Sequence, residues 1–256
     1  MIQQKVEIRF QKSEAVRFIS HHDLMRAMMR AVRRAGLPVR LTEGFNPRPR
    51  IVFPVALELG VASLDEVAEI EFNQCLDTQE VLRRLASAFP PGLKLTAVLE
   101  MPPFRAGRIP DRIQYLLHLQ EAEILIPETR IQALLQATTL PFQRQREKRV
   151  QSVDLRLALL SLNLATPNPL QPDQARDLEL AVRPSQSGSA RPLEILSLLM
   201  EVPLDQLRRV RVTKTRMDLC FPPETPKTEN PLPPLPADRQ SEAELTDEPM
   251  TLNLQS

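Results

Sequence analysis

The sequence predicts an α+β protein with two tandem ferredoxin-like units, in which each unit has the element order βαββαβ and an antiparallel sheet. Strand-like and helix-like segments alternate along the first hundred residues, and a second series of similar order comes after them. Between the two series, residues 101–111 contain three prolines and a glycine, which favour a linker. We therefore expect a first unit at residues 1–103, a second at 104–220 and a tail at 221–256.

Each predicted helix, strand or loop follows from a local sequence pattern. Alternating apolar and polar residues predict strands, apolar residues spaced three and four apart predict helices, and proline-rich segments predict loops. In the first unit we expect strand material at 6–12 and 16–20, a helix at 21–36, strands at 50–57 and 67–73, a helix at 77–89 and a strand at 93–101. In the second we expect a strand at 112–120, a helix at 127–137, strand material at 142–156 and 178–184, a helix at 192–200 and a strand at 208–219.

The composition of the last segment differs from that of the rest. Residues 221–256 contain eight prolines, seven acidic residues and two basic residues, which gives a net charge of −5. Prolines lack the backbone donor that strands need, and the few apolar groups cannot offset the entropy cost of ordering the chain. The segment predicts a disordered acidic tail, either a solvated extension or a weak competitor for a basic surface.

Positive charge is concentrated at the beginning of the chain. Residues 1–50 carry eleven Lys or Arg and four Asp or Glu, a net charge of 11 − 4 = +7, whereas the whole chain carries only +1. Such a local excess predicts a docking surface for an anionic partner, and RNA is the first candidate. Aromatic residues are scarce, and Phe10, Phe18, Phe53 and Phe72 lie in strand-like runs where burial is the expected role.

Cysteine content and missing motifs exclude several kinds of site. Cys75 and Cys220 alone cannot ligate an iron–sulfur cluster or a zinc finger, and neither phosphate-binding nor dinucleotide-binding glycine motifs occur. We therefore expect no metal and no cofactor. The N-terminus does not have the pattern of a signal peptide, and no segment is apolar enough to span a membrane. These features predict a cytoplasmic protein without a membrane partner.

The segment at 21–36 has the signals of a capped helix with two different faces. Ser20 and Asp23 have the spacing of a capping box, and Gly36 supplies the stop. A buried stripe is expected at helical spacing from Leu24, Ala27, Met28, Ala31 and Ala35. A positive stripe is expected on another face from His22, Arg26, Arg30, Arg33 and Arg34. These like charges favour a phosphate backbone or an acidic partner protein as ligand, and the alternative is a solvated face.

Two histidines lie in the first turn of this helix. Unpaired backbone N–H groups and the helix dipole favour anions there. His21 or His22 would then hold a phosphate or act as a general acid or base near neutral pH. The alternative is a polar helix start with one ring packed against the protein.

The segment Glu43–Arg50, EGFNPRPR, predicts a rigid loop that presents arginines. Gly44 permits a backbone conformation closed to other residues, and Pro47 and Pro49 stiffen the second half of the segment. Asn46 and Arg48, each before a proline, are expected to be extended. Arg48 and Arg50 are then expected to point to the same side and to bind phosphate or carboxylate. The alternative is a connector whose arginines pair with Glu43 or Glu58.

The second half contains a weaker basic pattern. Strand alternation predicts that Arg144, Arg146 and Lys148 lie on one face. Residues 185–192 form a loop of small residues that enters a helix at Pro192, and its amides together with Arg191 are a secondary candidate for an anion site.

The run from Val16 to Glu71, VRFISHHDLMRAMMRAVRRAGLPVRLTEGFNPRPRIVFPVALELGVASLDEVAEIE, resembles the opening of the radical-SAM-linked family, a conserved domain of unknown function. VDLR at 153–156, GSARPLEIL at 188–196 and VTKTRMDL at 212–219 resemble its later portions. Members of that family are encoded beside, or fused to, B12-binding radical SAM proteins, often near a ribonuclease E/G gene. The resemblance implies an accessory protein whose radical SAM partner binds in trans.

The sequence leaves three hypotheses. The first is a non-catalytic protein that binds RNA or presents substrate to a radical SAM enzyme. The second is a metal-independent RNA endonuclease that uses His21 or His22. The third is a protein-interaction module that docks on the partner enzyme. The expected docking face comprises Arg17, His22, Arg26, Arg30, Arg33, Arg34, Asn46, Arg48 and Arg50.

Overall fold

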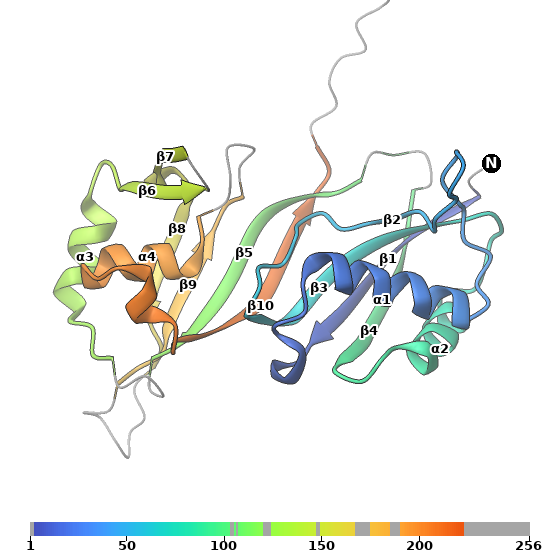
Figure 1. Ribbon diagram of the computed structural model, residues 1–256, viewed down its shortest axis with the longest axis horizontal. Coiled ribbons are helices and arrows are strands. Elements are labelled where there is room, and N and C mark those ends of the chain that lie inside the picture. Colours follow the sequence, from blue (N-terminus) through green and yellow to red (C-terminus); the bar gives the residue numbers. More distant parts are fainter. Residues whose placement is uncertain are drawn as a thin grey trace, which may run out of the picture. The chain divides into compact units, whose positions relative to one another are not determined.

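A large, mainly antiparallel sheet with helices packed on one side carries the fold, which confirms the predicted α+β class (Figure 1). The computed structural model describes residues 3–102, 105, 107–119, 124–146, 149–166, 175–184 and 190–222. Met1–Pro222 form one compact unit, and the predicted tail from Pro223 onward lies outside the described residues.

The strands are β1 (Gln4–Lys12), β2 (Ile51–Val52), β3 (Val61–Phe72), β4 (Leu93–Met101), β5 (Ile109–His118), β6 (Pro141–Arg146), β7 (Arg149–Asp154), β8 (Leu159–Leu164), β9 (Leu178–Val182) and β10 (Arg211–Cys220). The α-helices are α1 (His21–Arg34), α2 (Thr78–Ala88), α3 (Glu128–Gln136) and α4 (Pro192–Met200). Short 3₁₀ helices are η1 (Glu14–Val16), η2 (Leu155–Leu157) and η3 (Leu204–Leu207).

The main sheet has the strand order β4-β1-β3-β10-β5-β9-β8, and β2 pairs with β3 beside this path. Neighbouring strands are antiparallel throughout, except for β3 and β10, which run parallel. This parallel pairing is short, from Val61↔Val212 to Ser63↔Lys214, and joins the first half of the chain to the second. Both halves therefore contribute to one continuous sheet.

Several local predictions differ from the structure. Residues 16–20 alternate like a strand, but Val16 ends η1 and a turn follows it. The predicted strand at 50–57 is reduced to β2 because Pro54 cannot continue a ladder. Strand material at 142–156 forms β6 and β7, a separate two-stranded sheet. β8 was not predicted, because its residues belong to an apolar stretch that shows no clear alternation.

Two hydrophobic clusters lie on the side of the sheet that carries the helices, here called the helix side. The first packs Leu24 and Met28 of α1 and Leu85 of α2 against β1 and β3. The second packs α3 and α4 against β5, β8 and β9, with Ile195 and Leu117 fully buried. Figure 1 shows α1 and α4 on this side of the continuous sheet.

Charged side chains are buried where β1, β3 and β10 meet on the helix side. Lys12 is 1% exposed, Glu66 0% and Lys214 1%. Lys214 forms an ion pair with Glu66, and the Lys12 Nζ donates to the carbonyl oxygens of Arg17 at 2.8 Å and Ile19 at 3.4 Å. Burial lowers the pKa of Lys12, while the negative charge of Glu66 opposes that shift. This set is called the junction cluster below.

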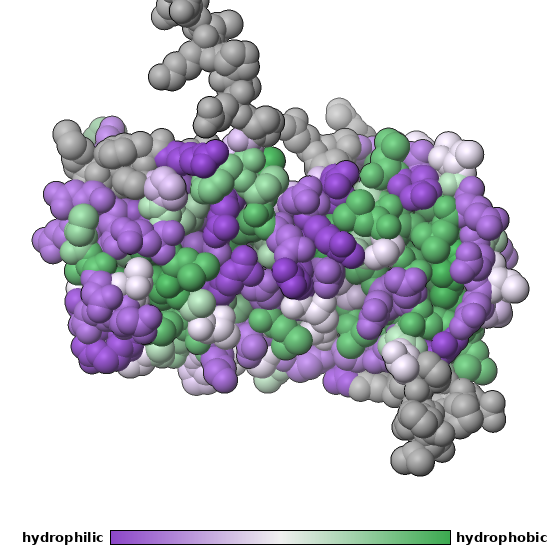
Figure 2. Space-filling model, turned by 180° about the vertical axis from the view of Figure 1, so that it is seen from behind, coloured by the Kyte–Doolittle hydropathy of each residue, from purple (hydrophilic) through white to green (hydrophobic). Residues whose placement is uncertain are grey.

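The opposite side of the sheet is here called the open side. In the first half of the chain, its charged side chains form ion pairs with one another. Lys5 binds Glu69 at 2.6 Å, Arg9 binds Asp65 at 2.7 Å, and Arg108 forms an ion pair with the fully buried Glu7. The first half thus neutralises its own charges on this side. Figure 2 shows the open side, where hydrophilic and hydrophobic residues are interspersed.

Both cysteines and the helices α1 to α4 lie in the described part of the chain. Cys75 and Cys220 are exposed free thiols, and no group of metal-ligating side chains occurs among the described residues. None of the helices in the described part of the chain is long and apolar enough to cross a membrane.

The junction cluster generates a stability prediction. We expect Glu66→Ala to lower the free energy of unfolding by about 3–5 kcal/mol, because it leaves two buried ammonium groups without their carboxylate. Urea unfolding followed by circular dichroism measures this. The matched control is Glu80→Ala, which removes a carboxylate that pairs with the exposed Arg83, and it should cost about 1 kcal/mol or less. Equal losses in the two variants would contradict the account.

Candidate nucleic-acid interface

A groove of about 340 Å³ opens on the helix side, between the segment that leads into α1 and the start of α4. Its walls come from parts of the chain that are far apart in sequence. One wall is Arg17 and Phe18, and the other is the segment 208–212 that enters β10. Leu59 and Gly60 line the floor between them. The name basic groove is used below for Arg17, Phe18, Leu59, Arg208, Arg209 and Arg211.

The first wall is held by its backbone. The carbonyl oxygen of Arg17 accepts from Lys12 Nζ at 2.8 Å and from the Gly60 N–H at 3.0 Å. The Phe18 ring lies 3.5 Å from where a side chain on Gly60 would begin, and Gly60 has a φ of +83°, so glycine suits this position. Phe18 is 66% exposed, which contradicts its predicted burial. The junction cluster thus fixes an aromatic ring at the surface.

The second wall is a turn with buried anchors and exposed arginines. Leu207 and Val210 are 2% and 6% exposed, and the Val210 N–H donates to the Leu207 carbonyl oxygen at 3.0 Å. Arg208 and Arg209 lie between these anchors and are exposed. Neither forms an ion pair with any residue that the structure describes. Their charges are therefore available to a ligand.

One carboxylate joins the two walls. Glu14 binds Arg17 at 3.1 Å and Arg211 at 3.5 Å. Four arginines around one glutamate leave a local charge of 4 − 1 = +3, since the nearby Glu58 is bound to Arg191 at 3.0 Å. The Arg17 guanidinium also lies 4.5 Å from the centroid of the Phe18 ring, a cation–π contact. The groove combines positive charge with an exposed ring.

The predictions for α1 agree largely with the structure. Ser20 is the N-cap and accepts from the Asp23 N–H, and the helix ends before Gly36, whose φ is +60°. Leu24, Met28 and Ala31 are buried as expected, together with Val32, whereas Ala27 and Ala35 are half-buried.

The positive stripe of α1 is exposed and only partly neutralised. Arg26 binds Asp23 at 3.4 Å, and Arg34 donates to the Ala88 carbonyl oxygen at 2.5 Å. Arg30 and Arg33 form no ion pair with the described residues. His22 is exposed at the end of α1 nearest the basic groove. The stripe therefore continues from the groove along α1, for about 16 Å between His22 and Arg33 at 1.5 Å per residue.

The EGFNPRPR loop lies at the other end of β1. The Thr42 N–H donates to the Arg48 carbonyl oxygen at 2.8 Å and closes the loop, and Phe45 at its tip is fully exposed. The loop base follows Val39, which pairs with Phe72 near the first residue of β1. Lys12, at the groove, is eight residues further along β1, about 26 Å at 3.3 Å per residue.

The loop residues were expected on one docking face with Arg17, but they do not belong to the basic groove. Arg50 binds Glu71 at 3.1 Å and shares it with Arg40, so neither Glu43 nor Glu58 is its partner. Asn46 and Arg48 are exposed, and Arg48 forms no ion pair within the described part of the chain. The structure thus separates Asn46, Arg48 and Arg50 from Arg17.

His21 and His22 differ in environment. The His21 ring packs edge-on against Phe53 with centroids 5.3 Å apart, and its buried Nδ1 has no hydrogen-bond partner among the described residues. Burial lowers the pKa of His21, and the adjacent His22 lowers it further, while Glu66 raises it. This geometry favours a packed helix start for His21. A catalytic role for either histidine stays a prediction.

The secondary set in the second half is not a joint anion site. Arg144 is 6% exposed and binds both carboxylate oxygens of the buried Glu194 at 2.7 Å, so it is not available to a ligand. Arg191 precedes α4, which begins at Pro192 as predicted, and binds Glu58. Lys148, the side chain of Arg146 and residues 185–189 lie outside the described residues.

Sequence reasoning missed Arg208, Arg209 and Arg211. The run RRVR at 208–211 is visible in the sequence, but its local pattern predicts only the start of a strand. Its position beside Arg17 depends on the β3–β10 pairing, which no local pattern reveals.

The depressed pKa of His21 predicts a pH-dependent stability. In the unfolded chain a histidine titrates near pH 6.5, so below that value the unfolded state binds a proton that the folded state binds less readily. Stability should therefore fall as the pH drops from about 7.5 to about 5.5. We expect a smaller fall of the urea midpoint in His21→Gln than in the parent protein. An unchanged fall in His21→Gln would contradict the assignment.

Comparison with solved structures gave matches of low similarity. The first is described as "Crystal Structure of a Cbf5-Nop10-Gar1 Complex", with 12% identity, a TM-score of 0.40 and coverage of 83% of this chain and 48% of that chain. The second is "Crystal structure of the archaeal box H/ACA sRNP Nop10-Cbf5 complex", with 14% identity, a TM-score of 0.35 and coverage of 84% and 48%. The chain spans about half the length of these two chains.

A third structure, "Crystal Structure of an Unknown Protein from Galdieria sulphuraria", matches with 12% identity, a TM-score of 0.26 and coverage of 85% of this chain and 99% of that chain. No curated protein matches the sequence. A family model matches residues 5–192, which is most of the chain. The chain therefore belongs to the family described as "Uncharacterized protein conserved in bacteria (DUF2344)".

Proposed function

We propose that this protein is a non-catalytic RNA-binding accessory protein, and that the basic groove binds a single-stranded segment of RNA. One observation carries the proposal: Arg208, Arg209 and Arg211 lie beside Arg17 and the exposed ring of Phe18. A positive groove that contains an exposed aromatic ring suits a chain of phosphates with stackable bases.

The charge distribution supports the same conclusion. Arg208 and Arg209 are exposed and held on a turn whose anchors are buried, so binding a phosphate would need little reordering of the backbone. The stripe formed by His22, Arg26, Arg30 and Arg33 extends the positive surface along α1. An RNA strand bound in the groove would therefore extend along this stripe.

We also propose that the fold consists of two ferredoxin-like units. The strand orders β4-β1-β3-β2 and β10-β5-β9-β8 place the four main strands of each half in the sequence fourth, first, third, second. This order supports two ferredoxin-like units, at 1–103 and 104–220, that share an edge through β3 and β10. The hairpin of β6 and β7 would then be an insertion in the second unit.

The proposal also includes a partner. The resemblance to the radical-SAM-linked family implies a radical SAM enzyme in trans, in the cytoplasm, to which this protein would present RNA. An acidic protein surface is the rival ligand of the groove. The exposed ring of Phe18 favours RNA, because a base can stack on it while phosphates contact the arginines.

Binding of single-stranded RNA tests the groove directly. We expect Arg208→Glu/Arg209→Glu to weaken binding of a short unstructured RNA at least tenfold. The slope of log affinity against log salt should fall by about 1.4, because two phosphate contacts of about 0.7 each are lost. Fluorescence anisotropy across a salt series measures both quantities.

The control is Arg83→Glu, which reverses the charge of an exposed arginine on α2, away from the groove. It should bind RNA nearly as the parent protein does. Equal affinity of the double variant and the parent, or equal losses in the double variant and the control, would exclude the groove as the RNA site.

Stacking on Phe18 can be tested separately from charge. Phe18→Ala should cost about 1–3 kcal/mol of binding free energy without changing the salt slope, because a base loses its platform while the phosphate contacts remain. Phe18→Trp keeps an aromatic surface and should retain most of the affinity. Similar affinities of the alanine variant and the parent would show that no base stacks there.

The rival ligand is tested in cell extracts. If RNA is the ligand, proteins that co-purify with this chain through the groove should be released by nuclease treatment. Co-purification that survives nuclease, but is lost in Arg208→Glu/Arg209→Glu, would favour a direct protein contact and contradict the proposal.

A further inference from the structure

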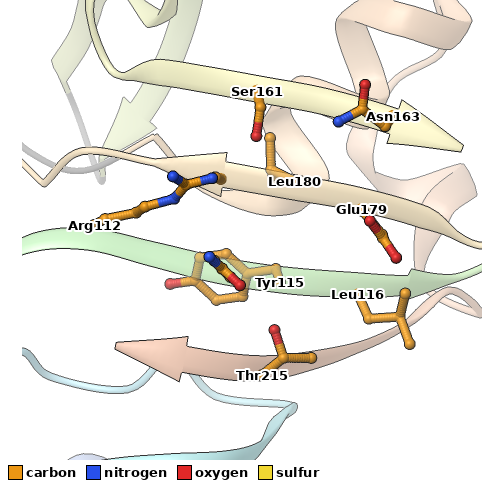
Figure 3. A pocket seen from close by; sticks show the side chains of 10 residues that line it. Arg112, Tyr115, Leu116, Ser161, Asn163, Glu179, Leu180 and Thr215 are labelled. Carbon is orange, nitrogen blue, oxygen red and sulfur yellow. The ribbon is translucent and has the colours of Figure 1, made fainter. Parts of the chain in front are cut away.

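A second hollow, of about 400 Å³, lies on the open side of the sheet in the second half of the chain, away from the basic groove. It is lined by side chains from β5, β8, β9 and β10, and Figure 3 shows the four strands side by side beneath it. Neighbouring residues on β5 point the other way: Ile113 and Leu117 are buried in the cluster that includes residues of α3 and α4. This volume falls in the range of small-molecule sites.

The strand register explains why the surface is hollow. Gln114 on β5 pairs with Ala181 on β9, and Ala181 pairs with Ser161 on β8. These three residues form a row across the sheet, and the two with the smallest side chains, Ala181 and Ser161, lie on adjacent strands. Because the side chain of Ala181 is a single methyl group, the row has a gap between longer neighbours. The next row is Leu116, Glu179 and Asn163.

The polar groups around this hollow are not paired with one another. Arg112 forms no ion pair with a described residue, and its buried Nε has no hydrogen-bond partner there. No hydrogen bond within the described part of the chain involves the side chains of Gln114, Ser161, Asn163 or Glu179. On the open side of the first half, by contrast, the charged side chains are paired: Lys5 with Glu69, and Arg9 with Glu7 and Asp65. Arg112, Gln114 and Ser161 are half-buried, and half-buried polar groups without protein partners favour a ligand that satisfies them, whereas Asn163 and Glu179 are exposed.

The charges have opposite signs at the two ends. Figure 3 shows Arg112 and Glu179 at opposite ends of the hollow, with Ser161 and Asn163 along one side. Arg112 is four residues from Leu116, the partner of Glu179, which places the two backbones about 13 Å apart along the sheet at 3.3 Å per residue. Because both side chains are long, their charged groups can lie considerably closer together than the two backbones. A ligand that fills the hollow therefore needs an anion at one end and a hydrogen-bond donor at the other.

We propose that this hollow binds a nucleoside monophosphate whose base carries an exocyclic amino group. A guanidinium binds phosphate through paired N–H donors, which assigns the phosphate to Arg112. A glutamate accepts from the amino group of a base, which assigns the base edge to Glu179. The amide of Gln114 and the hydroxyl of Ser161 lie between these ends, where ribose hydroxyls would be. Leu116 supplies apolar surface for one face of the base.

This site is independent of RNA binding in the basic groove, which opens on the other side of the sheet. Isothermal titration calorimetry of the full chain with AMP, CMP, GMP and UMP tests it. We expect the three amino-bearing nucleotides to bind, and UMP, which lacks the amino group, to bind about tenfold more weakly. No heat of binding with any nucleotide at millimolar concentration, or equal affinity for UMP, would overturn the proposal.

Two variants assign the ends of the ligand. Arg112→Gln should weaken CMP about tenfold and leave the affinity for cytidine unchanged, because only the phosphate contact is lost. Glu179→Gln should reduce the preference for CMP over UMP. The control is Arg216→Gln, which removes an exposed arginine of β10 that is paired with Asp218 and does not line the hollow. CMP affinity unchanged in Arg112→Gln, or lost equally in the control, would contradict the assignment.

The groove variant separates this inference from the proposed function. Arg208→Glu/Arg209→Glu should bind CMP as the parent does, and Arg112→Gln should bind single-stranded RNA as the parent does. Loss of both activities in either variant would show that a single site exists, and would contradict the second one.

Discussion

The ion pair between Glu66 and Lys214, with Lys12 beside it, is the interaction on which the rest of the structure depends. It lies where β1, β3 and β10 meet, and its charges are almost completely removed from water. Charges so buried persist only when an opposite charge lies beside them. Lys214 belongs to the short parallel pairing that joins the two halves of the sheet, so the pair fixes one half against the other.

The same cluster shapes the candidate site. Lys12 donates to the carbonyl oxygens of Arg17 and Ile19, which holds the segment that presents Phe18. Three residues before Lys214, β10 begins at Arg211, and Arg208 and Arg209 precede it. The two walls of the basic groove are therefore extensions of strands that meet at the junction. A ligand in the groove would contact both halves of the chain.

The two sides of the sheet offer different chemistry. On the helix side, the groove presents exposed cations and an aromatic ring, which suits a polyanion with bases. On the open side, the first half satisfies its own charges, whereas the second half keeps a small set of mixed donors and acceptors around a hollow. The proposed RNA site is therefore extended, whereas the proposed nucleotide site is compact.

Features with a local cause could be predicted from the sequence. The start and end of α1 are set by Ser20 and Gly36, and the start of α4 is set by Pro192, because caps and stops act within a few residues. Most of the positive stripe on α1 was predicted for the same reason. The α+β class could be predicted from the alternation of helical and strand patterns.

Features that depend on long-range pairing could not be predicted. Arg50 is paired with Glu71 because β2 pairs with β3, and Arg144 is buried because α4 brings Glu194 to it. Phe18 alternates with its neighbours like a strand residue, yet the turn held by Lys12 exposes it. The arginines of the second wall reach Arg17 only through the junction of β3 and β10.

Ultraviolet crosslinking shows which residues of the protein lie against bound RNA. The full-length protein, bound to short single-stranded RNA and irradiated with ultraviolet light, would be digested and its crosslinked peptides identified by mass spectrometry. The account predicts crosslinks at Phe18 and in the peptide that contains Arg208–Arg211, both on the walls of the groove. Crosslinks confined to the loop around Phe45, or to the open side of the sheet, would contradict it.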